Sequence, residues 1–252
     1  MKKSVVVNHD QKLKVLIDIS DDFDLAYVGF TVFTNDFKIT KTDWNLAGLA
    51  KNVAISTQLS GKPVDYEIVS LPKDMDGYMA GYLVGNGKSD SVTKLFEEQN
   101  KAGYSHVLIV KDQSLCITHN CDFVASGHGV NKWAVFSPMA YAVFNTATEE
   151  VLFNKHIAAM SYLRGVEYDF DSYKADDFRV ITECTLTRNI KYGLSLLEPP
   201  IWEKALPPGE VIDYDPVMAL MAKEQLLTKY ASDDCMKLHP EYDENWMARP
   251  RF

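Results

Sequence analysis

The run HVLIV, residues 106–110, is the feature that most constrains how this chain can fold. Its apolar side chains follow one another without alternation, which is typical of a strand covered on both faces. A helix is predicted just before it, because Ser89 or Asp90 can accept hydrogen bonds from first-turn amides and Gly103 can end the helix in the left-handed conformation. A strand covered on both faces needs other elements packed against it, so the sequence predicts an α/β fold.

The first part of the chain shows the same alternation of strand and helix. Residues 13–19 and 26–33 are rich in β-branched and aromatic side chains and predict two strands. Asp43 then precedes an apolar stripe at helical spacing, which predicts a helix over 44–59 with Asp43 as its cap. Residues 64–71 alternate like a further strand.

The second half predicts strand after strand. Four short strands are expected, at 114–118, 132–136, 140–145 and 150–158. A hairpin joins the last two, and four side chains can share one face across it: Tyr141, Val143, Val151 and Phe153. This part of the chain is therefore predicted to extend the sheet with antiparallel strands.

Helical patterns follow the strands. Asp176 or Asp177 can cap a helix that runs to about residue 197, and Asp215-Pro216 opens another helix. We expect an α/β domain over 1–197 and a C-terminal helical appendage over 198–252. The domain should contain a mixed sheet of about five or six strands, with helices packed on it and a late antiparallel hairpin.

Charge and hydropathy narrow the class of protein. The formal net charge of −9 disfavours a broad grip on nucleic acid, which depends on Lys and Arg neutralising phosphates. The opening residues MKKSVVVNHD lack the apolar run of about 7–15 residues that an export signal needs. No window reaches the ~18 apolar residues of a membrane-spanning helix. The chain as given is expected in the cytoplasm, or in the periplasm if a leader has been removed.

The segment from Cys116 to His128 is the main candidate for chemistry. Its possible metal ligands are Cys116, His119, Cys121 and His128. Zinc is held by such side chains, but the spacing matches no standard knuckle, and a cysteine nucleophile beside His128 is a further alternative. A turn-bearing strand connection, with 126–129 as a turn, explains the same residues. A Cys116–Cys121 disulfide is also possible in an oxidising compartment.

Two other segments offer weaker candidates. The glycine-rich stretch 77–87 could bind a small ligand, although it lacks the spacing of a phosphate-binding loop. Four carboxylates after the first strand could bind a divalent cation or form a solvated acidic turn: Asp18, Asp21, Asp22 and Asp24.

The order of elements resembles a known kind of domain. The segments, in chain order, are VGFTVF, NLAGLAKNVAISTQLS, YEIV, SVTKLFEEQNKAG, SHVLIV and YAVFNTATEEVLF. This pattern resembles the α/β domain of bacterial envelope proteins such as the curli secretion lipoprotein and the TolB amino-terminal domain. The resemblance implies a binding or assembly role in or near the cell envelope, often in an oligomer, without catalytic residues or a cofactor.

We therefore expect a non-enzymatic bacterial interaction or assembly protein whose partner is another protein or a second copy of this chain. Tyrosine-rich exposed regions favour binding. The candidate contact residues are Tyr78, Tyr82, Tyr168, Phe170 and Tyr173. The same rings could instead close the core. The alternatives are a hydrolase or metal-dependent enzyme built on the Cys116–His128 segment, and a ligand-binding module built on 77–87.

Overall fold

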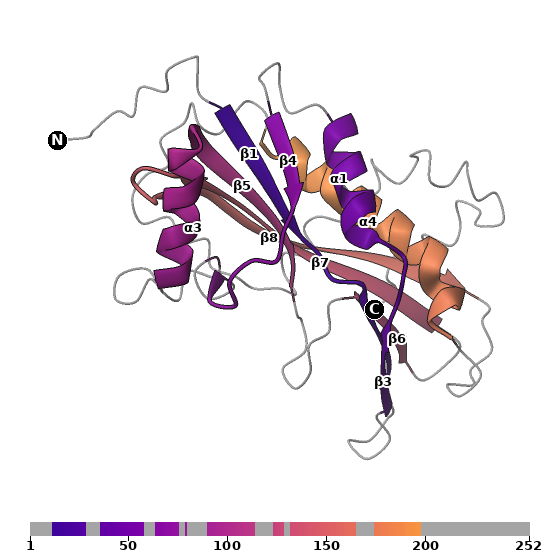
Figure 1. Ribbon diagram of the computed structural model, residues 1–252. Coiled ribbons are helices and arrows are strands. Elements are labelled where there is room, and N and C mark those ends of the chain that lie inside the picture. The colour runs from indigo at the N-terminus through magenta and orange to yellow at the C-terminus, as the bar shows by residue number, and fades with distance from the viewer. Residues whose placement is uncertain are drawn as a thin grey trace.

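Eight strands of the described chain form one mixed sheet in the computed structural model (Figure 1). The structure describes residues 12–28, 36–57, 64–75, 79, 90–113, 123–128, 132–164 and 174–197. The strands are β1 (Lys12–Asp18), β2 (Asp22–Val28), β3 (Asp36–Lys41), β4 (Val64–Ile68), β5 (Tyr104–Asp112), β6 (Phe123–His128), β7 (Lys132–Asn145) and β8 (Val151–Arg164). The helices are α1 (Leu46–Ser56), α3 (Asp90–Lys101), the 3₁₀ turn η2 (Ala175–Phe178) and α4 (Arg179–Ser195). The predicted α/β fold with helices on a mixed sheet is confirmed.

The strands fall into five rows because several of them lie end to end. β7 pairs with β8 along one side, and along its other side with β6 at 133–136 and with β5 at 139–145. β1 lies beside β5 and β2 beside β6, both in parallel. The outermost row consists of β4 beside β1 and of β3 beside β2. The expected five or six strands thus correspond to rows, and the breaks within rows were not predicted.

The parallel strands and their helices lie close to the predicted places. β1, β4 and β5 each overlap the run that predicted them. α3 begins at Asp90, and Gly103 follows its end with a positive φ of 88°, as expected for a left-handed terminator. Asp43 is not the cap of α1, which was predicted over 44–59. The Leu46 amide instead donates to the Asp21 carboxylate at 2.7 Å, and Asn45 is the residue before the helix.

The region of β2 and β3 differs from the prediction. β2 starts at Asp22, inside the stretch taken for an acidic turn, and β3 pairs with it in an antiparallel hairpin that the sequence did not predict. β3 reads DFKITK, and its mixture of charged and apolar residues gives no clear alternation. An outermost strand needs no apolar face as continuous as that of an inner strand, which explains why this one was missed.

β7 is one strand where two were predicted. Pro138 lies in its middle and cannot donate a ladder hydrogen bond. It stands between the stretch paired with β6 and the stretch paired with β5, where the Gln113 amide donates to its carbonyl at 3.0 Å. Residues 126–128, predicted as part of a turn, lie in β6, where Gly127 is opposite Trp133.

The hairpin of β7 and β8 is confirmed, with one correction to its faces. Tyr141, Val143 and Phe153 share a face, as predicted. Val151 does not, because the register shifts between Val143 and Phe144 and places Val151 against the opposite side of the sheet.

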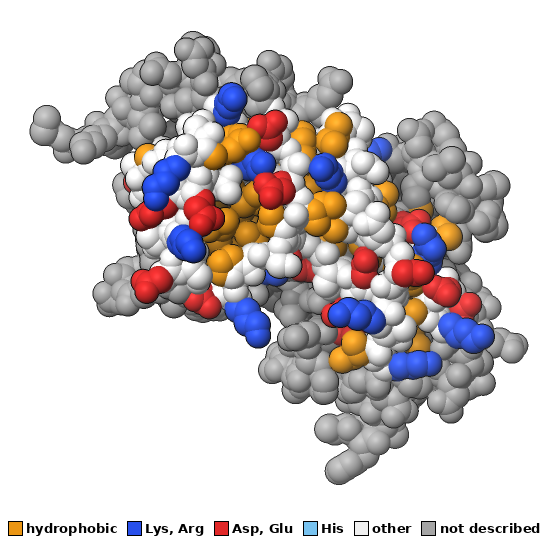
Figure 2. Space-filling model, viewed as in Figure 1, with side chains coloured by type: hydrophobic (Ala, Val, Ile, Leu, Met, Phe, Trp, Pro, Cys, Tyr) orange, Lys and Arg blue, Asp and Glu red, His pale blue; other side chains and the backbone are white. Residues whose placement is uncertain are grey.

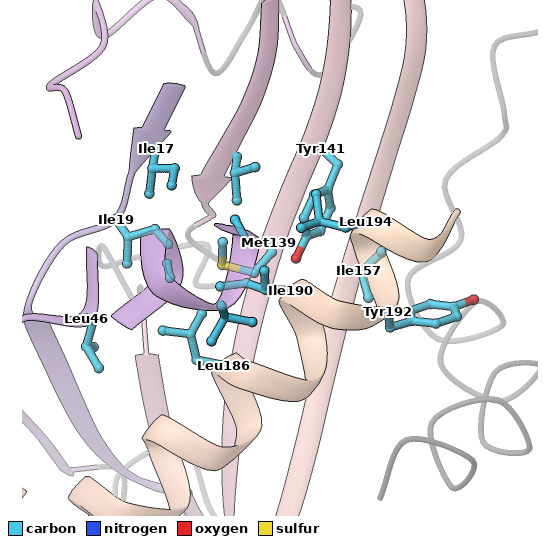
Figure 3. Close-up of a cluster of buried hydrophobic side chains, with 14 of the residues drawn as sticks. Ile17, Ile19, Leu46, Met139, Tyr141, Ile157, Leu186, Ile190, Tyr192 and Leu194 are labelled. Atoms are coloured by element: carbon cyan, nitrogen blue, oxygen red, sulfur yellow. The ribbon is translucent and has the colours of Figure 1, made fainter. Parts of the chain in front are cut away.

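The larger core lies between the sheet and the helices α1 and α4. Figure 3 shows its side chains, with Ile17 and Ile19 from the β1 row, Met139 and Tyr141 from β7, and the apolar face of α4 across them. An amide side chain joins the layers. Asn189 accepts from the Tyr141 hydroxyl at 3.0 Å and donates to the carbonyls of Ser137 and Ile157. α4 is therefore fixed to β7 and β8 by directed bonds as well as by apolar contact.

The smaller core lies on the other face of the sheet, under α3. Phe96 of α3 packs on Phe144 of β7 with ring centroids 5.0 Å apart, and Met75 and Met79 are fully buried beside them. The carbonyl of Met79 accepts from the Asn154 side chain of β8. Side chains of β8 thus hold the segment that carries the two methionines.

α4 begins later than the sequence predicted. Asp177 accepts from the Lys174 amide at 2.8 Å and Asp176 accepts from the Trp44 indole at 2.9 Å, so both carboxylates belong to the turn η2 that precedes the helix. α4 ends at Ser195, close to the expected end. The appendage over 198–252 lies outside the described residues and stays a prediction.

Candidate interaction surface

The predicted site residues fall outside the part of the chain that the structure describes. Tyr78, Tyr82, Cys116, His119, Cys121, Tyr168, Phe170 and Tyr173 are all in this group. The backbone of His128 lies in β6, and its side chain is not described. Of the glycine-rich stretch 77–87, only Met79 is described, as a buried core residue. These assignments stay predictions.

Within the described ranges, no group of three or more potential ligands could hold a metal ion. The described helices also include none that is long and apolar enough to cross a membrane. Cys184, which is 3% exposed on α4, is disulfide-bonded. The sequence had left open whether this protein contains any disulfide.

The carboxylates after β1 are engaged in structural bonds. Asp18 forms an ion pair with Lys111 at 3.0 Å and accepts from the Leu71 amide at 3.2 Å. Asp112 accepts from the Ser20 amide at 2.6 Å. These bonds tie the loops after β1 and β4 to the end of β5. Of the four carboxylates proposed as a cation site or solvated turn, Asp18 and Asp21 thus accept from backbone amides or an ammonium, and Asp24 is buried in β2.

β4 is an outermost strand, and its two sides differ in chemistry. Val64, Tyr66 and Ile68 point toward α1, whereas Asp65 and Glu67 lie on the opposite side, in register with Lys14 and Leu16 of β1. No described strand pairs with the outer side of β4. Among the described strands, the outward backbone N–H and C=O groups of β4 therefore have no ladder partner, as at the edge of a sheet.

The acidic side of β4 is held in place by its neighbours. Lys14 pairs with Glu67 at 2.8 Å, and the Tyr104 hydroxyl donates to Asp65 at 2.6 Å. Burial opposes the charged form of Lys14, but Glu67 and the nearby groups outweigh it and raise the pKa of Lys14 above its usual value. The hydrogen bond to Asp65 raises the pKa of the Tyr104 phenol. Both carboxylates therefore have fixed positions.

This arrangement leaves negative charge outermost. The Lys14 side chain is 14% exposed, so its ammonium is largely covered, whereas the Glu67 side chain is 51% exposed. Asp65 is exposed as well. The face therefore presents two carboxylates to solvent and one largely covered ammonium, so an approaching group meets a net negative surface.

The other side of β4 is apolar and partly open. Ile68 is 46% exposed at the end of the strand, and Ile55 of α1 is equally exposed. Tyr66 is half-buried on the same side of β4, and its hydroxyl donates to the Ala54 carbonyl of α1 at 3.4 Å. We call these five residues, Ile55, Asp65, Tyr66, Glu67 and Ile68, the β4 surface. Figure 2 shows apolar side chains gathered near the centre of the view, between the charged side chains over α3 and those over α1, where β4 lies in Figure 1.

Sequence reasoning missed this surface. VDYEI alternates apolar and acidic residues, which is a signal for a strand with one wet side. Its place at the edge depends on pairing with β1, which precedes it by about fifty residues, and no local pattern reports such a partner. Exposure of Ile68 follows from that place and not from its neighbours in the chain.

Comparison with known proteins gives only distant likenesses. No protein-family model matches the chain, and no curated protein matches it. Among solved structures, a Xanthomonas campestris protein of family DUF330 is 9% identical, with a TM-score of 0.40 over 74% of this chain and 82% of that one. The PelC dodecamer from Paraburkholderia phytofirmans is 10% identical, with a TM-score of 0.32 over 77% of this chain and 93% of that one.

Lipoprotein GNA1162 from Neisseria meningitidis is 8% identical, with a TM-score of 0.29 over 71% of this chain and 96% of that one. These neighbours are bacterial proteins, and one of them is a lipoprotein. All three TM-scores are below 0.5, so the functional argument rests on the residues of this chain.

Proposed function

We propose that this chain is a non-enzymatic bacterial protein of the cell envelope that binds another protein through the β4 surface. The observation that carries the proposal is an outermost strand, β4, whose last residue, Ile68, is apolar and exposed. Covering the exposed half of one isoleucine is worth about 1 kcal/mol. A strand added to β4 would gain backbone hydrogen bonds as well.

The engagement of the described charged groups supports a binding role. Asp18, Lys111 and Asp112 hold backbone amides and one another, and Lys14, Asp65 and Glu67 form a fixed layer at the edge. In both clusters, these side chains bond to one another, to the Tyr104 hydroxyl or to backbone amides. Both clusters shape a surface.

The disulfide of Cys184 supports a place in the envelope. Disulfides persist in oxidising compartments such as the bacterial periplasm and are rare in reducing cytoplasm. The chain has four cysteines, so a native disulfide leaves at most two free thiols. We expect thiol titration of the denatured, unreduced protein, made with an export leader, to give two thiols or fewer. Three or four free thiols would mean that the disulfide is absent and no longer supports a place in the envelope.

The predicted aromatic residues remain part of the proposal as additional contacts: Tyr78, Tyr82, Tyr168, Phe170 and Tyr173. Single alanine variants of the five, assayed for partner binding, test them. A contact residue weakens binding without lowering thermal stability, whereas a residue that closes the core lowers both.

Site-specific photocrosslinking tests the proposal directly. We expect benzoylphenylalanine at Ile68, in the full chain exported in bacterial cells, to give a discrete adduct that mass spectrometry assigns to a protein. Lys94, whose side chain is 75% exposed on α3, is the matched control and should give none. An Ile68 adduct no stronger than that of the Lys94 control would contradict a binding role for the β4 surface.

A further inference from the structure

We propose that the occupant of the β4 surface is an extended protein segment that alternates basic and apolar residues and adds to the sheet as a strand beside β4. This inference rests on the proposed function and names the chemistry of its partner. It follows from the different character of the two sides of β4.

An added strand must match both sides of β4 at once. Successive side chains of a strand point to opposite faces, so every second residue of the segment meets Asp65 and Glu67, and the residues between meet Tyr66 and Ile68. Opposite charges directly across two strands are favourable, and like charges are unfavourable. The first set should therefore be Lys or Arg.

The intermediate set should be apolar. Ile68, which is 46% exposed, lies on the α1 side with Tyr66, so β-branched or aromatic residues in the segment can cover it. The carboxylates on the opposite side do not need to move, because Lys14 and Tyr104 already fix them. A basic side chain from the partner would bind to a prepared pair of oxygens, which limits the entropy lost on binding.

The same charges argue against a second β4 strand as the occupant. An antiparallel pair of β4 strands centred on Tyr66 would place Asp65 of each copy opposite Glu67 of the other. Two such repulsions within a strand of five residues outweigh the favourable apolar packing of Ile68 against Val64 of the other copy. The surface thus selects for a partner of opposite charge.

Peptide binding to the full chain tests the inference. The probe is a seven-residue peptide of alternating Lys and Ile, with an isomer that groups the same residues in two blocks and an analogue that has Glu in place of Lys. We expect the alternating basic peptide to bind at least about tenfold more tightly than either comparison peptide, and to weaken as salt screens the charges.

A charge reversal makes the test specific. The double variant Asp65→Lys with Glu67→Lys should prefer the Glu peptide to the Lys peptide, whereas the control Glu97→Lys with Glu98→Lys on α3 should keep the original preference. Both pairs are exposed, so folding is expected to survive, and equal melting temperatures would verify this. A third variant, Ile68→Lys, should weaken binding of the Lys peptide through its effect on the apolar side.

The outcomes separate the two proposals. If Ile68 crosslinks to a protein but the alternating peptide binds no better than its block isomer, the inferred chemistry of the partner is wrong and the binding role stands. If the double variant keeps the preference for Lys, the carboxylates of β4 do not select the partner, and the inference is overturned. If Ile68 gives no adduct, the proposed function itself fails.

Discussion

The two faces of the sheet are sealed in different ways. On the α4 face, three hydrogen bonds of Asn189 reach the two strands β7 and β8 across a large apolar core. On the α3 face, a smaller core is closed by Phe96 and two methionines, whose segment is held by side chains of β8. The difference indicates that the α4 face fixes the position of its helix relative to the strands, whereas the α3 face relies on apolar contact and a few side-chain bonds.

Replacing Asn189 should have the largest effect. Asn189→Ala removes three hydrogen bonds at a fully buried site and leaves two backbone carbonyls and the Tyr141 hydroxyl without this partner. We expect a loss of about 3–4 kcal/mol in the free energy of unfolding, measured with denaturant. Asn100→Ala, at an exposed position of α3, should cost less than about 0.5 kcal/mol. Similar losses for both variants would show that Asn189 does not distinguish the α4 face.

A smaller loss is expected from a methyl group added to α4. A Cβ at Gly193 would overlap the ring of Tyr141, which cannot withdraw without leaving Asn189. Gly193→Ala should therefore destabilise the protein by about 2 kcal/mol through overpacking. The double variant Gly193→Ala with Tyr141→Leu should lose less stability than the two single variants lose together, because Tyr141→Leu makes room for the methyl group. Additive losses would contradict direct contact between helix and strand here.

The α3 face should respond to pH with the smallest of the three effects. Burial lowers the pKa of His156, although a hydrogen bond to the Met79 backbone opposes the shift. The folded protein therefore binds this proton less readily than the unfolded chain. The stability that neutral His156 contributes is complete above about pH 6.5 and is lost as the pH falls below it, with a slope of at most about 1.4 kcal/mol per unit.

Comparison with a variant isolates this contribution. Between pH 7.5 and pH 5.5, the wild-type protein should lose more stability than His156→Gln in denaturant unfolding, by no more than about 1.4 kcal/mol. Hydrogen exchange should place the loss in α3 and the Met79 segment and leave α4 unchanged. Equal losses in both proteins would show that His156 is not the source of the pH dependence.

How far the sequence predicts the structure depends on where the deciding contacts lie. α3 and β5 were predicted well because Asp90, Gly103 and the apolar run after it act within a few residues of one another. β3 and β6 were missed because a polar outermost strand and a strand that contains Gly127 lack a local signature. The continuity of β7 through Pro138 has no local signature either, since its two halves pair with different strands that precede it in the chain.

The candidate surface follows the same rule. The alternation of β4 is visible in the letters VDYEI, but its place at the edge and its ion pair with Lys14 depend on pairing with β1. The predicted contact residues were chosen by composition, because exposed tyrosines favour binding. Composition cannot report which side chains a fold leaves at an edge.

The five-row sheet constrains the order in which the molecule can be built during synthesis. Val15 of β1 pairs with Leu108 of β5, and Leu25 of β2 pairs with Ala125 of β6. The first two strands are therefore synthesised long before the inner strands that they pair with. At about 5–20 residues per second, this delay lasts seconds, during which these apolar strands remain available to chaperones. The hairpin of β7 and β8 closes on its own, since its strands are separated only by a short turn. A nascent chain of this protein therefore stays open for longest at its beginning, which is the state that an export machinery would need to receive it in.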